Sequence, residues 1–127
     1  MSRIPPLSKG SDIVNIRDEE VEAALRPVRN RFCNLLTERI LVLEACRKQA
    51  AIDADPLHVL ERIAGIAHKI SGVGAMLGFH RAGELAGSLE QTISAMRNTT
   101  AGYSGFHSKI DSQLEALLDE LELLLDR

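Results

Sequence analysis

The sequence predicts an all-α protein, an antiparallel up-down-up-down four-helix bundle with a short extra helix at its amino-terminal side. Apolar residues recur at three- and four-residue steps over four segments of the 127-residue chain, which is the period of buried helix faces. Hydrophobic residues make up 45% of the chain but aromatic residues only 3%, so its core is aliphatic and suits helix-on-helix packing. The short connections predict antiparallel neighbours in a single domain.

The amino-terminal segment, residues 1–16, carries prolines, serines and a glycine with few apolar positions. Such a composition buries too little surface to order itself, so we expect an unfolded tail there and the bundle over residues 17–127. Acidic residues from Asp18 onward favour a helix start. Because Pro27 disfavours helical geometry at Arg26, the first helix is expected to end there and a second one to begin.

This second helix is long and ends near Ala50. Its expected core face consists of Val28, Phe32, Leu35, Leu36, Ile40, Leu43 and Cys46. Cys33 and Cys46 would lie about 20 Å apart on one helix, beyond the reach of a disulfide, so both are expected to be packing thiols in a reducing compartment. The sequence has no membrane span and no signal-peptide layout, and the predicted location is the cytoplasm.

The next helix has start and stop signals at both ends. Asp55 is a candidate cap, Pro56 suits the first helical position, and Gly78 is a residue that commonly ends a helix. Its expected buried stripe consists of Leu60, Ile63, Ile66, Ala67, Ile70, Val73 and Leu77. A third helix is expected over residues 80–97 and a fourth over residues 106–126, separated by a loop at 98–105 and buried through residues such as Leu89, Ile93, Leu114 and Leu125.

His68 lies roughly 150° away from the centre of the buried stripe of its helix, and is therefore expected to face solvent. Each interior glycine costs a helix about 1 kcal/mol relative to alanine, yet Gly65, Gly72 and Gly74 all lie nearby. Gly74 falls on the buried stripe, where close helix packing explains it. Gly65 and Gly72 flank the exposed imidazole, so they indicate a surface that a docking partner approaches closely.

The stretch around His68 resembles the histidine-containing phosphotransfer (HPt) domain of multistep phosphorelays. In that family an exposed histidine is followed by glycines four and ten positions later, here Gly72 and Gly78. The segment from Leu25 to Ala50, with its Arg-Phe-Cys-Asn-Leu-Leu core, also looks like the helix that precedes the histidine helix. The resemblance covers residues 18–127.

The resemblance implies that His68 is a phosphoacceptor that relays a phosphoryl group between the aspartates of receiver domains. The expected partners are response-regulator receiver domains and a hybrid sensor histidine kinase. The protein would be a monomeric phosphocarrier and not an enzyme. It would need no cofactor or metal of its own, with Mg²⁺ expected in the partner receiver. Nucleic acid is not an expected partner, because the net charge is −3 and the basic residues are scattered.

Several residues around His68 are candidates for contact with the partner: Ala64, Gly65, Lys69, Ser71, Gly72, Ala75 and Phe79. The family often has lysine three residues after the histidine, and Ser71 occupies that place without a charge. Folding the chain back near Gly78 places Leu89 and Glu90 opposite His68. Glu90 is therefore a candidate to accept a hydrogen bond from Nδ1, although the plainer interpretation is a solvated surface charge.

Two other functions compete with this interpretation. A histidine-kinase dimerisation hairpin also displays a phosphoaccepting histidine, but that family follows it with an acidic residue and a proline. Here Lys69 follows, and no proline occurs after Pro56. The alternative that stays open is a non-phosphorylated helical adaptor that binds receiver domains or other signalling partners, which Ser71 favours. The other histidines, His58, His80 and His107, have no second ligand at metal spacing.

Overall fold

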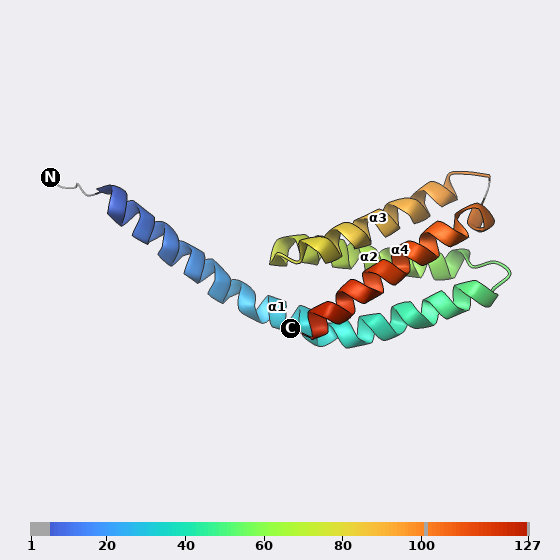
Figure 1. The fold of residues 1–127 in the computed structure, drawn as a ribbon, viewed down its shortest axis with the longest axis horizontal. Coiled ribbons are helices and arrows are strands. Elements are labelled where there is room, and N and C mark those ends of the chain that lie inside the picture. Colours follow the sequence, from blue (N-terminus) through green and yellow to red (C-terminus); the bar gives the residue numbers. More distant parts are fainter. Residues whose placement is uncertain (1–5, 101, 127) are drawn as a thin grey trace. The chain divides into compact units, whose positions relative to one another are not determined.

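The computed structural model describes residues 6–100 and 102–126, with side chains from residue 18 onward, and this part of the chain contains four α-helices and no strand. They are α1 (Pro6–Ile52), α2 (Leu57–Leu77), α3 (His80–Arg97) and α4 (Gly102–Leu125) (Figure 1). The all-α prediction is therefore confirmed. The chain divides into two units, Met1–Phe32 and Cys33–Arg127, and each is described by itself.

The short extra amino-terminal helix predicted before Pro27 does not exist as a separate element. Pro27 lies inside α1, which continues on both sides of it. A proline lacks the N–H that would bond to the carbonyl four residues earlier, so it removes one hydrogen bond from the ladder. Extending an established helix gains one hydrogen bond for each residue fixed, which lets a helix of 47 residues absorb this loss.

The helix also begins earlier than expected. Residues 6–16 belong to α1, whereas the composition of this segment predicted an unfolded tail, and residues 1–5 of that tail lie outside the described residues. Pro6 is the first helical residue, a position where its missing N–H has no helical partner to lose. A helix that is already nucleated extends at little cost, so composition alone did not locate its start.

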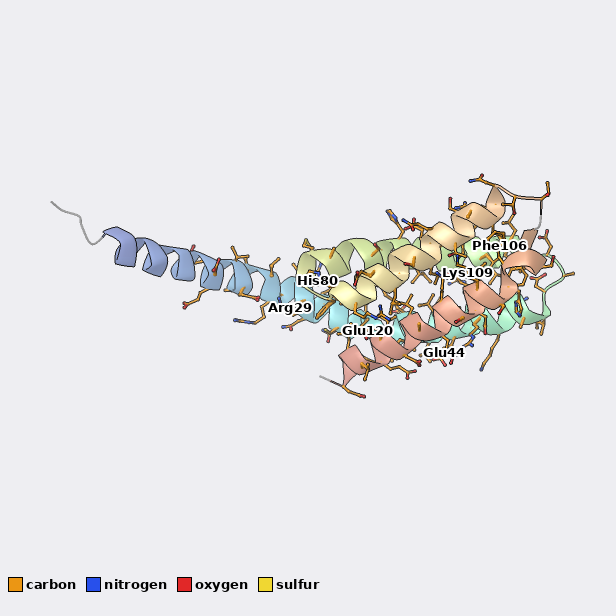
Figure 2. All side chains as sticks on the ribbon, turned by 45° about the horizontal axis from the view of Figure 1, so that its top comes forward. Arg29, Glu44, His80, Phe106, Lys109 and Glu120 are labelled. Atoms are coloured by element: carbon orange, nitrogen blue, oxygen red, sulfur yellow. The ribbon has the colours of Figure 1, made fainter. Side chains whose placement is uncertain are left out.

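The core of the unit Cys33–Arg127 is aliphatic, as predicted. Figure 2 shows the side chains that the helices direct toward one another. The largest fully buried ones are Leu36, Leu43, Leu60, Ile63, Ile70, Leu89, Ile93, Leu114, Leu117 and Leu121. Three residues expected inside are exposed: Val28 in the other unit, Leu35 and Leu125 have exposed fractions of 40%, 37% and 40%. Ile66 and Val73, also expected inside, are half-buried.

The two ends of α2 differ in how well local signals predicted them. Gly78 ends the helix with a left-handed φ of 85°, and the N–H of Phe79 donates to the carbonyl of Gly74 at 2.8 Å. At the other end Asp55 is not the cap. The N–H of Asp55 instead donates to Oδ1 of Asp53 at 3.1 Å, and α2 starts after Pro56 without a side-chain cap.

The bounds of α3 agree with the prediction, but α4 starts at Gly102, four residues before the predicted Phe106. Gly102 has a φ of 63°, which glycine adopts without strain. The Tyr103 hydroxyl lies 2.5 Å from Nδ1 of His107, one turn further along. This contact stabilises an additional first turn that turn-forming residues had suggested was loop.

Ion pairs tie the helices of this unit together at their surface. Arg47 on α1 binds Asp111 on α4 through two hydrogen bonds of 2.7 and 2.9 Å, and also reaches Glu115 at 3.1 Å. These bonds lower the pKa of Asp111 and raise that of Arg47. Arg97 on α3 binds Glu61 on α2 at 3.1 Å. Both cysteines are free, as expected.

Candidate functional site

His68 lies in the middle of α2 with its side chain 75% exposed. The helix turns its buried residues, among them Ile63, Ala67 and Ile70, toward the core, and the histidine lies on the opposite side. The His68 side chain therefore contributes little to the packing of the core. Its imidazole is available to a molecule that approaches from solvent.

The backbone around His68 is uncovered. A Cβ built on Gly65 or on Gly72 would meet no atom within 4 Å, and both residues are exposed, as is Ala75. No contact within the described structure therefore requires glycine at these two positions. The backbone here is open to close approach, and contact of Gly65 and Gly72 with a partner stays a prediction.

Glu90 on α3 lies directly beside the histidine, with Oε2 2.9 Å from Nδ1 of His68. The Glu90 side chain is 35% exposed, so this carboxylate is partly shielded, whereas the imidazole is not. The structure thus brings together the two residues that the turn near Gly78 was expected to place opposite each other. The role of Glu90 in orienting the ring stays a prediction.

Close packing of α2 against α3 makes this contact possible. A Cβ on Gly74 would lie 3.2 Å from the carbonyl oxygen of Phe79 and 3.3 Å from the backbone nitrogen of Gly83. Both neighbours are backbone atoms, which cannot rotate away. Gly74 therefore lets the two helices approach closely, which confirms its predicted packing role, and the short separation brings Glu90 within reach of His68.

Ser71 faces α3. A Cβ on Gly87 would lie 3.4 Å from the Ser71 hydroxyl oxygen, and Ser71 is half-buried. The serine thus contributes a small side chain to the seam between α2 and α3, at the position where the family often has a lysine. Gly83 and Gly87, one turn apart on α3, were not singled out from the sequence. Their spacing of four residues was the signal of a close helix contact.

One of the predicted contact residues is wrong. Ala64 is buried, with 7% of its surface exposed. It lies two turns before Ser71 on the same face of α2, the face that packs on α3, so a partner cannot reach it. Lys69 is exposed and Phe79 is half-buried at the end of α2. Their contact with a partner stays a prediction.

Met76 also belongs to this surface, although it was not predicted from the sequence. It is 55% exposed and lies one turn beyond Gly72 on α2. An exposed large apolar side chain beside bare glycines suits contact with another protein. The signal was present in the sequence, since Met76 lies outside the buried stripe of its helix.

The described part of the chain shows no group of three or more His, Cys, Asp or Glu side chains arranged to hold a metal ion. Of the other histidines, His58 and His80 are exposed and His107 contacts Tyr103. None of the helices that the structure describes is both long and apolar enough to cross a membrane.

Fold and site together define an all-helical module in which an exposed histidine, His68, has a carboxylate beside its Nδ1. Comparison with family models agrees: the model of the Hpt domain matches residues 27–126. The chain therefore belongs to the Hpt domain family. Hpt domains are phosphocarrier modules of two-component signalling that interact with receiver domains and kinases. Comparisons with curated proteins and with solved structures give no match.

Proposed function

We propose that this protein relays a phosphoryl group between receiver-domain aspartates, with His68 as the carrier. The observation that carries the proposal is the 2.9 Å contact between Glu90 and Nδ1 of an otherwise exposed imidazole. In a neutral imidazole one ring nitrogen donates and the other accepts. Because Glu90 can only accept when ionised, it favours the tautomer with the proton on Nδ1 and leaves the lone pair on Nε2.

Transfer then follows from this arrangement. The Nε2 lone pair attacks the phosphorus of an aspartyl phosphate on the receiver, the new N–P bond forms, and the P–O bond to the aspartate breaks, which returns a carboxylate. The positive charge that develops on the imidazole is stabilised by Glu90. Handing the group to a second receiver reverses these steps.

Phosphoryl transfer depends mostly on positioning and charge neutralisation, so the chain itself needs little more than an accessible nitrogen and a fitted surface. We propose that the receiver brings Mg²⁺, and that this chain needs no cofactor of its own and acts as a phosphocarrier without independent enzymatic activity. Gly65, Gly72 and Ala75 would give the receiver close access, with Lys69 and Phe79 at the edges of the contact.

We further propose that the helices after Cys33 form an up-down-up-down bundle. The connections α1–α2 and α3–α4 lie at one end and α2–α3 at the other, which supports this order (Figure 1). The protein would act as a monomer in the cytoplasm, between a hybrid sensor kinase and a response regulator.

The test is incubation with a panel of phosphorylated receiver domains and Mg²⁺. We expect acid-labile, base-stable phosphate on the wild-type chain and on His107→Gln, which changes an exposed histidine of α4, but not on His68→Gln. Label on both variants would place the acceptor elsewhere and contradict the proposal.

The second candidate, a non-phosphorylated adaptor, is favoured by one observation. Ser71 brings no charge to the position where the family often has lysine, and its hydroxyl faces α3. An adaptor would bind receivers without acquiring phosphate, and its binding would survive His68→Gln. Receiver binding without label on the wild-type chain would select this function.

A further inference from the structure

A groove between α1 and α2 runs beside the histidine face. It has a volume of about 530 Å³ and is lined by Leu35, Glu38, Arg39, Val42, Arg62, Gly65, Ile66 and Lys69. Gly65 and Lys69 are also neighbours of His68 on α2, so the groove opens onto the surface around the imidazole. A second hollow of about 350 Å³ continues it, since Val42 and Arg62 line both.

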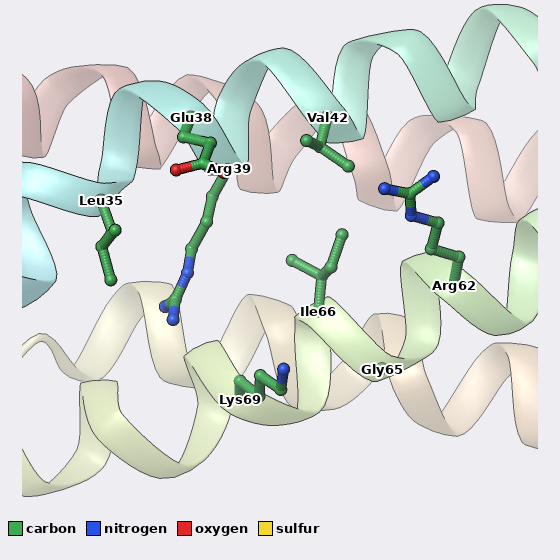
Figure 3. A pocket seen from close by; sticks show the side chains of 8 residues that line it. All are labelled: Leu35, Glu38, Arg39, Val42, Arg62, Gly65, Ile66 and Lys69. Carbon is green, nitrogen blue, oxygen red and sulfur yellow. The ribbon is translucent and has the colours of Figure 1, made fainter.

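Positive charge dominates this groove. Arg39, Arg62 and Lys69 contribute three cationic groups against the single carboxylate of Glu38. Figure 3 shows Arg39 extending from α1 toward α2, while Arg62 extends from α2 toward α1 near Val42. Among the described residues that line the continuation, which include His58 and Gln49, there is no carboxylate.

The floor of the groove is apolar. Leu35 and Val42 on α1 and Ile66 on α2 point into the space between the helices (Figure 3). Leu35 is 37% exposed and Ile66 is half-buried, although the pattern of the sequence placed both in the core. An apolar floor between cationic rims fits an amphipathic segment whose polar side is acidic.

The other side of His68 has the opposite character. The groove between α2 and α3 is lined by Ser71, Ala75, His80, Gly83, Glu84, Gly87, Ser88 and Gln91. No lysine or arginine occurs among these described lining residues, and Glu84 and the nearby Glu90 are acidic. A partner that covers His68 therefore meets positive charge toward α1 and negative charge toward α3. This difference in charge favours one orientation of the partner over the reversed one.

We propose that the α1–α2 groove is the orienting part of the docking surface, and that its occupant is an acidic amphipathic segment of the partner receiver domain next to its phosphoaspartate. This inference rests on the proposed function and adds the chemistry of the partner surface. Apolar side chains of that segment lie on Leu35, Val42 and Ile66, and its carboxylates face Arg62, Arg39 and Lys69. Charge pairing of this kind sets orientation and the rate of encounter more than it sets the chemical step.

The test uses the full chain and the receiver domain that labels wild-type His68 fastest in the assay described above. Transfer rates are measured against receiver concentration for wild type, for Arg62→Glu and for the matched control Lys109→Glu, which makes the same charge change on an exposed residue of α4. We expect Arg62→Glu to raise KM about tenfold, as loss and reversal of a docking charge would. Its kcat and unfolding midpoint should match those of the control.

Salt provides a second readout. Raising the ionic strength screens interactions between surface charges, so KM of the wild-type chain should rise with salt while KM of Arg62→Glu changes less. Equal KM values for Arg62→Glu and Lys109→Glu overturn the docking proposal and leave the carrier function intact. A wild-type chain that no receiver labels overturns the proposed function, and the docking proposal with it.

Sedimentation addresses the other possible occupant. Association of the protein with itself that depends on concentration and disappears in Arg62→Glu would assign the groove to a second copy, and would overturn the assignment to a receiver. We expect the sedimentation of wild type and Arg62→Glu to be the same.

Discussion

At the level of single residues, the site consists of an exposed histidine and a half-buried carboxylate beside it. The His68 side chain is exposed, while Glu90, on the next helix, is half-buried and lies 2.9 Å from one edge of the imidazole ring. Gly65 and Gly72 add no side chain that would keep a partner away.

Glu90 should act as a positioning residue. Glu90→Ala removes the acceptor for Nδ1, so the ring loses its preferred tautomer and orientation, and we expect kcat for transfer to fall roughly tenfold, a barrier increase of about 1.4 kcal/mol. Glu90→Gln retains an amide oxygen that can accept and should lose less. KM should change little in both. Single-turnover transfer to the two variants, with Glu120→Ala on α4 as control, measures this, and an unchanged rate in Glu90→Ala would remove the role.

The glycines should fall into two groups by their effect on stability. Gly65→Ala and Gly72→Ala place a Cβ in open space, so each should raise the free energy of unfolding by about 0.5–1 kcal/mol through helix propensity. Gly74→Ala places a Cβ 3.2 Å from the carbonyl oxygen of Phe79, so it should destabilise the protein instead. Urea denaturation of the three variants checks this. A Gly74→Ala protein as stable as Gly72→Ala would contradict the packing account.

At the level of elements, an ion pair between Arg47 and Asp111 joins α1 to α4 at the surface. Asp111 accepts two hydrogen bonds from Arg47, which lower the pKa of its carboxyl group below the ordinary value. A folded-state pKa below the unfolded one means that the folded chain binds the proton less readily. The stabilisation is therefore complete above the unfolded pKa and is lost as the pH falls through the folded pKa.

Asp111→Asn should remove this pH-dependent contribution. Because the Asp111 side chain is 40% exposed, solvent screens the pair, and we expect the free energy of unfolding at neutral pH to fall by only about 0.5–1 kcal/mol. The variant should also lose less stability than wild type when acidified below pH 4. Thermal unfolding across this range checks the slope, with Asp119→Asn, an exposed acid on the same helix, as control. Equal slopes for wild type and Asp111→Asn would contradict it.

The elements also show what the sequence could and could not predict. Gly78 and the bounds of α3 followed from local signals, because a left-handed residue ends a helix whatever packs around it. Pro27 did not end α1, because the cost of one missing hydrogen bond was outweighed by the helix on both sides. Ala64 and Leu35 were misplaced because their exposure depends on how closely α3 and α2 approach, which the period of a single helix does not specify.

At the level of the whole molecule, the segment that matches the Hpt family and the second structural unit start at different residues of α1. The Hpt match starts at residue 27, whereas the second unit starts at Cys33. The site, its grooves and the ion pairs between helices all belong to that second unit.

We therefore expect that a chain lacking residues 1–26 keeps the unfolding midpoint and the transfer rate of the full chain. Circular dichroism and the receiver-domain assay compare the two proteins. Loss of cooperative unfolding in the shortened chain would show that the first part of α1 is needed for the fold.

The proposed function depends on one nitrogen atom, Nε2 of His68. The most direct test is a measurement that identifies which nitrogen carries the phosphoryl group. After transfer from a receiver domain, ¹H–¹⁵N and ³¹P NMR of the labelled protein reports which ring nitrogen carries phosphorus. We expect the phosphoryl group on Nε2 of His68, with the proton that faces Glu90 still on Nδ1. Phosphorus on Nδ1, on another residue, or on no residue of a protein that binds the receiver would contradict the account.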